Sequence, residues 1–209
     1  MAGKYMKNNT MDISAIISDQ IRSSISVKEK VLSDRVLLEK IKDAAQSIIL
    51  AYKNNKKTLL AGNGGSAADA QHIAGEFVSK FYFDRPGIPS VALTTDTSII
   101  TAIGNDYGYD LLFERQVQAQ GMAGDVFIGI STSGNSENLV RALKVCREKG
   151  IKTVGLTGIS GGKMKDLCDI CLQVPSMETP RIQECHILIG HIICCIVEAE
   201  LFGEFKPVE

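Results

Sequence analysis

His72 and Glu76 are two chemically active side chains that stand four positions apart, shortly after a glycine-rich turn. Residues four apart on an α-helix project from the same face. An imidazole and a carboxylate arranged in this way can hold a metal ion together or move protons. The spacing therefore predicts a helix that carries a reactive pair.

The turn before this helix has the composition of an anion-binding loop. This glycine loop, Gly62-Asn63-Gly64-Gly65-Ser66, follows an apolar run that is typical of a strand. Glycines let a backbone approach a ligand closely, and a helix start presents unpaired amides to a negative group. The loop lacks the Gly-x-Gly-x-x-Gly spacing of dinucleotide-binding proteins. A phosphorylated small molecule is therefore the ligand that this segment favours.

A second polar turn, the serine loop Ser131-Thr132-Ser133-Gly134-Asn135-Ser136, repeats this arrangement after another apolar run. Its hydroxyl groups can donate to a phosphate, its glycine permits a tight turn, and Ser136 is of a type that caps helices. No Gly-Lys-Ser or Gly-Lys-Thr sequence follows, which argues against an ATP-binding P-loop. The segment is either a phosphate cradle or a polar turn that only caps its helix.

Further candidate ligands lie in the long apolar C-terminal segment, which contains Gln183, His186 and His191. On a helix, Gln183 and His191 differ by about 80° around the axis and by roughly 12 Å along it, near the limit for converging on one atom. Each histidine is either a satisfied core residue or a ligand. Together, His72, Glu76, Gln183 and His191 would form a nitrogen and oxygen set suited to zinc or another divalent first-row metal.

Residues 103–109, with the sequence Ile-Gly-Asn-Asp-Tyr-Gly-Tyr, are expected to form a third polar loop. Asp106 in this loop could bind sugar hydroxyls, transfer a proton or hold a turn, and its spacing does not decide among these roles. The loop adds a candidate pocket residue without assigning its chemistry.

The elements that would position these residues alternate between strands and helices after residue 54. Strands are expected at residues 58–61, 90–93, 125–130, 153–156 and 170–174. Helices are expected at residues 66–81, 97–103, 111–120, 136–149, 162–167 and 180–201. Such alternation predicts a doubly wound α/β fold, a five-stranded parallel sheet with helices on both faces. Ligands of these sheets bind at the carboxyl ends of the strands, where both loops would lie.

The segment before the sheet is helical in pattern. Residues 1–10 are polar and predicted to be disordered, and residues 12–54 are predicted to form two amphipathic helices within a single domain over residues 11–209. Ser33-Asp34 could cap the second helix. The two helices have much apolar surface and little of their own to bury it against. They pack either on the sheet or on the same helices of another subunit.

The composition is that of an ordinary globular protein, with 44% hydrophobic and 22% charged residues among 209. A net charge of −1 creates no field that would attract nucleic acid or an anionic membrane. No secretory signal or membrane span is visible, so the chain is expected to be cytoplasmic. The six cysteines fit this location as reduced, mostly buried thiols. Cys168-x-x-Cys171 has the spacing of half a zinc site, but no second pair with suitable spacing follows.

These motifs together resemble the sugar isomerase (SIS) family, and within it the phosphoheptose isomerases. The resemblance runs from about residue 57 to residue 201, and the two leading helices also fit. Some family members have an acidic residue where this chain has Pro180, so no role of that acid is transferred. The resemblance is carried by the glycine loop, the serine loop, Asp69-Ala70-Gln71-His72 with Glu76, Thr95-Asp96, Gly104-Asn105-Asp106 and Arg181-Ile182-Gln183-Glu184.

The resemblance implies an aldose–ketose isomerase that converts sedoheptulose 7-phosphate to D-glycero-D-manno-heptose 7-phosphate, the first step towards activated heptose for a surface polysaccharide. It implies a homotetramer with active sites between subunits. It also implies one Zn²⁺ per subunit, bound by His72, Glu76, Gln183 and His191. The positions that match phosphate-binding residues are Ser131, Thr132, Ser133 and Ser136, and those that match the sugar pocket are Asn63, Gly64, Gly65, Asn105 and Asp106.

Isomerisation of an open-chain sugar moves a proton between C1 and C2 through a cis-enediol. We expect Glu76 to remove the C1 proton and His191 to move a proton at the sugar oxygens, with the reverse assignment left open. The alternative function is a non-catalytic binding protein of this fold that associates with the replication initiator. That relative looks to lack residues matching Glu76 and His191, which this chain has. A third possibility is an isomerase or sensor for a pentose or amino sugar phosphate.

Overall fold

Five short apolar segments form one parallel sheet in the computed structural model, which describes residues 12–203. The strands lie in the order β2-β1-β3-β4-β5, and every neighbouring pair is parallel. Each predicted strand matches an observed one to within one residue at either end, and the predicted doubly wound α/β fold is confirmed. The expected disorder of residues 1–10 lies outside the described range. The strands are β1 (Thr58–Gly62), β2 (Ser90–Ala92), β3 (Val126–Ile130), β4 (Lys152–Thr157) and β5 (Ile170–Gln173).

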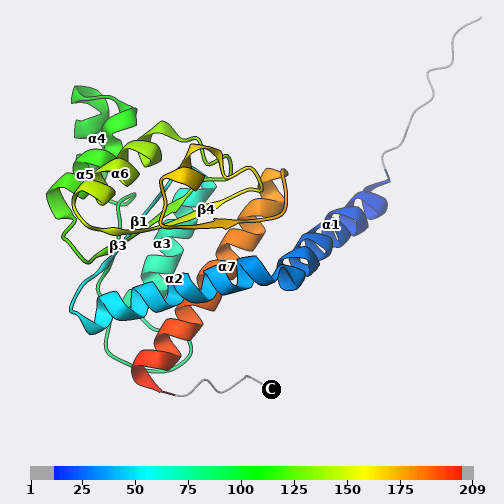
Figure 1. The fold of residues 1–209 in the computed structure, drawn as a ribbon. Helices are drawn as coiled ribbons and strands as arrows, with labels where there is room; N and C mark the ends of the chain where they lie inside the picture. The colour runs from blue at the N-terminus through cyan, green and yellow to red at the C-terminus, as the bar shows by residue number, and fades with distance from the viewer. Residues whose placement is uncertain (1–11, 204–209) are drawn as a thin grey trace, which may run out of the picture.

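Helices cover both faces of this sheet (Figure 1). Alternate residues of a strand point to opposite faces, so Leu60 of β1 belongs to one hydrophobic core and Leu59 and Ala61 belong to the other. This explains why the strands are apolar at every position. The first core is closed by α2 (Arg35–Lys53), α3 (Gly65–Val78) and α7 (Thr179–Phe202), and the second by α4 (Thr97–Asp106), α5 (Leu112–Gln120) and α6 (Glu137–Glu148).

The prediction of a polar loop at residues 103–109 is wrong for its first half, because residues 103–106 belong to α4. Asp96 caps the start of α4 by accepting a hydrogen bond from the amide of Ile99 at 2.9 Å. The helix ends before Gly108, whose φ of +85° favours glycine and stops the helix. Gly104 is therefore an interior helical residue and not the beginning of a turn. Residues 109–111 form the short 3-10 turn η1 (Tyr109–Leu111).

The helix predicted at residues 162–167 is instead a 3-10 segment, η2 (Gly162–Asp166). Gly161 and Gly162 both have positive φ, at +70° and +51°. An ordinary α-helical turn cannot begin with two residues in the left-handed region. The positive φ of these two glycines therefore prevents the α-helix that the residue pattern predicts.

The two N-terminal helices have different surroundings. α1 (Ile13–Ser33) and α2 meet at Asp34, which has extended backbone and caps α2 by accepting from the Leu37 amide at 3.0 Å. α2 packs against α7 and β5 within the first core. α1 projects away from the sheet in Figure 1, with Val27 and Val31 as its buried residues. Its exposed apolar side chains are Ile13, Ile16, Ile17, Ile21, Ile25 and Leu32.

α7 is the one helix within residues 12–203 that is long and apolar enough to cross a membrane, judged by length and composition alone. In the structure it packs against α2, α3 and α1. Its apolar character is accounted for by burial in the first core, which contains Ile182, Ile189, Ile193 and Val197.

The cysteines are free thiols, and most are buried. Burial raises the pKa of Cys146 to about 12, so this thiol stays protonated and unreactive at pH 7. Cys171 is buried beside Thr157 at 3.6 Å, and its pKa is also raised by burial. These surroundings are those of packing residues.

Candidate functional site

The strand order places the glycine loop and the serine loop at the same edge of the sheet. The winding of the chain reverses between β1 and β3, because β2 lies beyond β1 and β4 lies beyond β3. Gly62 at the end of β1 is paired with Ile130 at the end of β3. The loops that follow these two strands therefore flank the crevice in which ligands bind in doubly wound sheets.

A pair of amide side chains connects the two sides of this crevice. Asn63 of the glycine loop and Asn138 of α6 donate hydrogen bonds to each other at 3.1 and 2.9 Å. The Tyr109 hydroxyl also donates to the Asn63 side-chain oxygen, at 2.9 Å. The sequence does not indicate that Asn138 and Tyr109 contact Asn63, because they lie 75 and 46 residues from it along the chain.

The hydroxyl groups of the serine loop converge. Ser131 Oγ is 3.0 Å from Ser136 Oγ and accepts from the Gly134 amide at 3.2 Å. Ser133 Oγ accepts from the Asn135 amide at 3.1 Å. Ser136 occupies the N-cap position of α6, but its side chain makes no capping hydrogen bond and faces Ser131 instead. Hydroxyls gathered beside a helix start are the environment that a phosphate requires.

The chain after β4 supports the serine loop. Gly134 has a φ of +66°, and a Cβ on it would lie 2.1 Å from the carbonyl oxygen of Gly161. The Met164 amide donates to the Gly134 carbonyl at 3.0 Å. Only a glycine at position 134 permits this approach of the two backbones.

His72 and Glu76 on α3 meet His191 on α7. The Nε2 atoms of the two histidines are 2.8 Å apart, and His72 Nε2 is 3.2 Å from Glu76 Oε1. One potential ligand atom from each of the three residues lies within 4.8 Å of the others. Two nitrogens bound tetrahedrally at zinc distances would be about 3.3 Å apart. These residues therefore fit a zinc ion after small side-chain adjustments, and we call them the His–Glu–His cluster.

The cluster is partly shielded from solvent. The side chains of His72 and Glu76 are 49% and 25% exposed. The pKa of His191 is lowered by burial and then by the neighbouring His72, while Glu76 opposes the shift. The lowered pKa favours the neutral imidazole, which is the form that binds a metal or accepts a proton. One turn before His72, an oxygen of Asp69 has no hydrogen-bond partner within residues 12–203, and burial raises the pKa of that carboxyl.

Gln183 lies against the start of α3. A Cβ on Gly65 would be 2.6 Å from Gln183 Nε2, so the carboxamide covers the beginning of this helix. α3 rises by 1.5 Å per residue, which separates Gly65 from His72 by about 10 Å along the axis. Gln183 thus contacts the glycine loop, and its role as a fourth metal ligand stays a prediction.

The remaining candidates lie apart from the cluster. His186 is fully buried, its Nε2 is 3.1 Å from the Thr157 carbonyl, and burial lowers its pKa to about 4. It is therefore a neutral core residue. Asn105 and Asp106 are exposed at the end of α4 and hydrogen-bond to each other at 2.8 Å. Within residues 12–203 no hydrogen bond joins them to the other candidates, so their place in a sugar pocket stays a prediction.

Known proteins resemble this chain over most of its length. Residues 21–158 match a family model described as SIS domain. The chain is 67% identical over 193 residues to phosphoheptose isomerase 2 of Campylobacter jejuni, covering 92% of this chain and 96% of that protein. It is 68% identical over 186 residues to the phosphoheptose isomerase of Aneurinibacillus thermoaerophilus, covering 89% and 94%.

A solved structure agrees with these sequence comparisons. The phosphoheptose isomerase of Neisseria gonorrhoeae superposes with a TM-score of 0.84 at 43% identity, covering 90% of this chain and 99% of that one.

Replacing Gly134 with alanine should disrupt the serine loop. The new Cβ would meet the Gly161 carbonyl, and the positive φ is unfavourable for alanine, so we expect a loss of about 2 kcal/mol or more of stability. The affinity for inorganic phosphate, measured by calorimetry, should fall as well. Urea unfolding measures the loss of stability. Gly75→Ala on α3 is the matched control, because its Cβ meets nothing within 4 Å and should stabilise by about 0.5–1 kcal/mol. Wild-type stability in Gly134→Ala would contradict the described packing.

Proposed function

Since the chain belongs to the SIS domain family and, within it, to the phosphoheptose isomerases, we propose that it interconverts sedoheptulose 7-phosphate and D-glycero-D-manno-heptose 7-phosphate in heptose biosynthesis. The observation that carries this proposal is the meeting of His72, Glu76 and His191 across α3 and α7. An imidazole and a carboxylate in contact can supply the acid and base that an aldose–ketose isomerase needs. The alternative of a non-catalytic binding protein is not favoured.

The dimensions of the site suit a seven-carbon sugar phosphate. The serine loop would form the anion-binding end, the glycine loop lies beside it at the same edge of the sheet, and His72 lies about 10 Å along α3 from Gly65. The eight bonds from C1 of the substrate to phosphorus span about 9 Å, at the advance per bond of an extended chain. These similar lengths support a pose with the phosphate at the serine loop, the sugar beside the glycine loop and C1 at the His–Glu–His cluster.

Binding would use the two loops in different ways. Ser131, Thr132, Ser133 and Ser136 would hold the phosphate through hydroxyls and amides, without a fixed cation. Asn63, whose amide is oriented by Asn138 and Tyr109, would contact sugar hydroxyls. The other proposed pocket residues are Gly64, Gly65, Asn105 and Asp106.

A zinc ion would be held by His72, Glu76 and His191, with Gln183 as the proposed fourth ligand. When bound, such an ion polarises oxygens of the sugar and stabilises the negative charge of an enediolate. The fit rests on the distances within the His–Glu–His cluster and on its nitrogen and oxygen donors.

The chain's own residues account for the proton transfers. Glu76 takes the proton from C1 of the ketose and returns it to C2, while His191 moves a proton from O1 to O2, so that a cis-enediol forms and collapses to the aldose. Glu76 Oε1 contacts His72, so Oε2 is the oxygen that would act as the base. Burial lowers the pKa of His191, which keeps this imidazole neutral at pH 7 and leaves a ring nitrogen that can accept a proton.

We also propose a cytoplasmic homotetramer without nucleic-acid or membrane partners. The isoleucines of α1 are exposed in one chain, and α2 and α7 border a surface cavity of about 1180 Å³ that includes Ile49, Leu50 and Ile196. Apolar surface of this kind is usually covered by another protein surface. Copies of α1 that pack on one another would bury the isoleucines, and copies that pack into this cavity would bury both surfaces.

The assembly can be tested by changing α1. Ile17→Asp places a charge on the exposed apolar face of this helix, so it should lower the mass measured by light scattering from that of four chains towards one or two. Ser14→Asp, on the same helix, is the matched control. A single-chain mass for the unaltered protein would contradict the proposal.

The proposed activity predicts that the purified protein forms the aldose from sedoheptulose 7-phosphate. Preincubation with a chelator should lower the rate by about two orders of magnitude, because a metal contributes several kcal/mol to stabilising charge, and added Zn²⁺ should restore it. The aldose is followed by NMR. Unchanged turnover after chelation would remove the metal from the proposal, and no product under any condition would favour the binding-protein alternative.

Glu76→Gln tests the proton transfer. The amide cannot accept the C1 proton, so kcat should fall by about 10²–10⁴-fold, while the affinity for inorganic phosphate stays unchanged. Zinc content is measured in the same preparation, which separates loss of the base from loss of the metal. Near-normal turnover in this variant would rule Glu76 out as the base and favour His191.

A further inference from the structure

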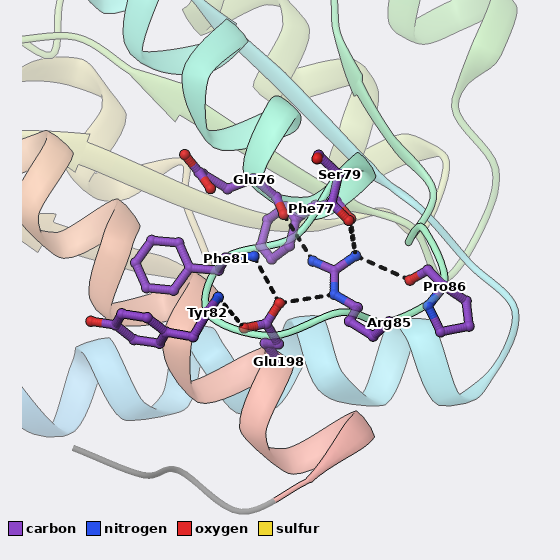
Figure 2. A network of polar contacts seen from close by, with 8 residues as sticks. All are labelled: Glu76, Phe77, Ser79, Phe81, Tyr82, Arg85, Pro86 and Glu198. Carbon is purple, nitrogen blue, oxygen red and sulfur yellow. Dashed lines mark hydrogen bonds and ion pairs between the residues drawn. The ribbon is translucent and has the colours of Figure 1, made fainter. Parts of the chain in front are cut away.

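Arg85 and Glu198 form a buried ion pair at the end of α3. Their side chains are each 2% exposed, and Arg85 Nε is 3.0 Å from Glu198 Oε1. Arg85 lies in the segment between α3 and β2, whereas Glu198 is on α7, 113 residues later. Figure 2 shows this pair at the centre of a network of polar contacts.

The Arg85 guanidinium closes the C-terminal end of α3. It donates to the carbonyl oxygens of Glu76, Phe77 and Ser79 at 2.8, 2.6 and 3.0 Å, and to that of Pro86 at 3.1 Å. The last carbonyls of a helix have no hydrogen-bond partner within the helix and form the negative end of its dipole. A cation with N–H donors therefore hydrogen-bonds to these carbonyls and also interacts favourably with the dipole. Arg85 thereby fixes the helical turn that contains Glu76. In Figure 2 the Glu76 carboxylate points away from Arg85 while its carbonyl faces the guanidinium.

The Glu198 carboxylate holds the segment that follows α3. Its Oε1 accepts from the Phe81 amide at 2.8 Å, and its Oε2 accepts from the Tyr82 amide at 2.6 Å. The Phe81 ring lies 5.5 Å from the His191 ring, measured between centroids. His191 and Glu198 are seven residues apart, which places them two turns apart on the same face of α7. The carboxylate therefore joins α7 to the segment that packs on His191.

Every polar atom of the pair has a partner. The three guanidinium nitrogens of Arg85 and both carboxylate oxygens of Glu198 are engaged. A buried ion pair adds little net stability compared with apolar side chains of the same volume, because two charges must leave water. Its contribution here is to fix the position of α3 relative to α7, since Arg85 binds the backbone of α3 and Glu198 belongs to α7.

We propose that Arg85 and Glu198 are a positioning pair that sets the placement of Glu76 relative to His191. Neither side chain touches the reacting atoms in this arrangement. The pair acts through the last turn of α3 and through Phe81, so its effect is on proton transfer and on metal affinity and not on the phosphate end of the site. This inference rests on the proposed isomerase function.

Glu198→Gln tests the pair, because the amide can replace only one of the two carboxylate oxygens as an acceptor. We expect kcat to fall about 10-fold or more and the zinc affinity to fall about 10-fold, as for other residues that orient metal ligands. The KM for sedoheptulose 7-phosphate should stay within about threefold, because the serine loop is untouched. Zinc affinity is measured by competition with a chromophoric chelator, and folding by urea unfolding.

Arg85→Lys is the conservative partner variant. Lysine keeps the positive charge beside Glu198 but cannot reach all the carbonyls that the guanidinium fork binds. Its kcat and zinc affinity should therefore lie between those of the unaltered protein and Glu198→Gln. If Glu198→Gln fails to fold, this variant decides the question by the same measurements.

Glu39→Gln is the matched control, since Glu39 forms an exposed ion pair with Lys42 on α2. It should leave kcat, zinc affinity and the urea midpoint unchanged. A folded Glu198→Gln or Arg85→Lys protein with a lower urea midpoint but unaltered kcat and zinc affinity would show a purely structural pair and overturn the inference. Absence of turnover in the unaltered protein would instead contradict the proposed function, and the zinc affinities would still test the positioning.

Discussion

The close contact between α3 and α7 is the constraint on which the candidate site depends. The helices approach because Gly190 has no side chain, and a Cβ there would lie 2.6 Å from Ile73 Cδ1. His72 precedes Ile73 and His191 follows Gly190, so the same approach brings the two imidazoles within 2.8 Å. A larger residue at position 190 would separate the helices and divide the His–Glu–His cluster.

α3 connects the two ends of the site. Its first turn follows the glycine loop at the carboxyl edge of the sheet, its middle carries His72 and Glu76, and its last carbonyls are bound by Arg85. Because the helix is rigid along its axis, the distance from the glycine loop to the reactive pair is set by the number of residues between them. Anchoring both ends of α3 therefore fixes the position of His72 and Glu76 relative to the glycine loop.

The sequence predicts those features that depend on local patterns, and it fails where distant residues meet. Apolar runs locate every strand, and the spacing of His72 and Glu76 places them on one helix face. Gly104 and Gly108 are both plausible helix stops, and only the backbone shows that the second has positive φ. The contacts of Asn63 with Tyr109 and of Arg85 with Glu198 join segments 46 and 113 residues apart, for which a single sequence carries no signal.

The short distance between His72 Nε2 and His191 Nε2 has a consequence for protonation. At 2.8 Å one nitrogen must donate and the other accept, so the two rings cannot both carry a proton on these atoms. Burial and the neighbouring His72 lower the pKa of His191, which favours its neutral form. The lone pairs that a metal would use are thus the ones that share a proton in its absence. Proton and metal compete for the same atoms, which couples the metal affinity of the cluster to pH.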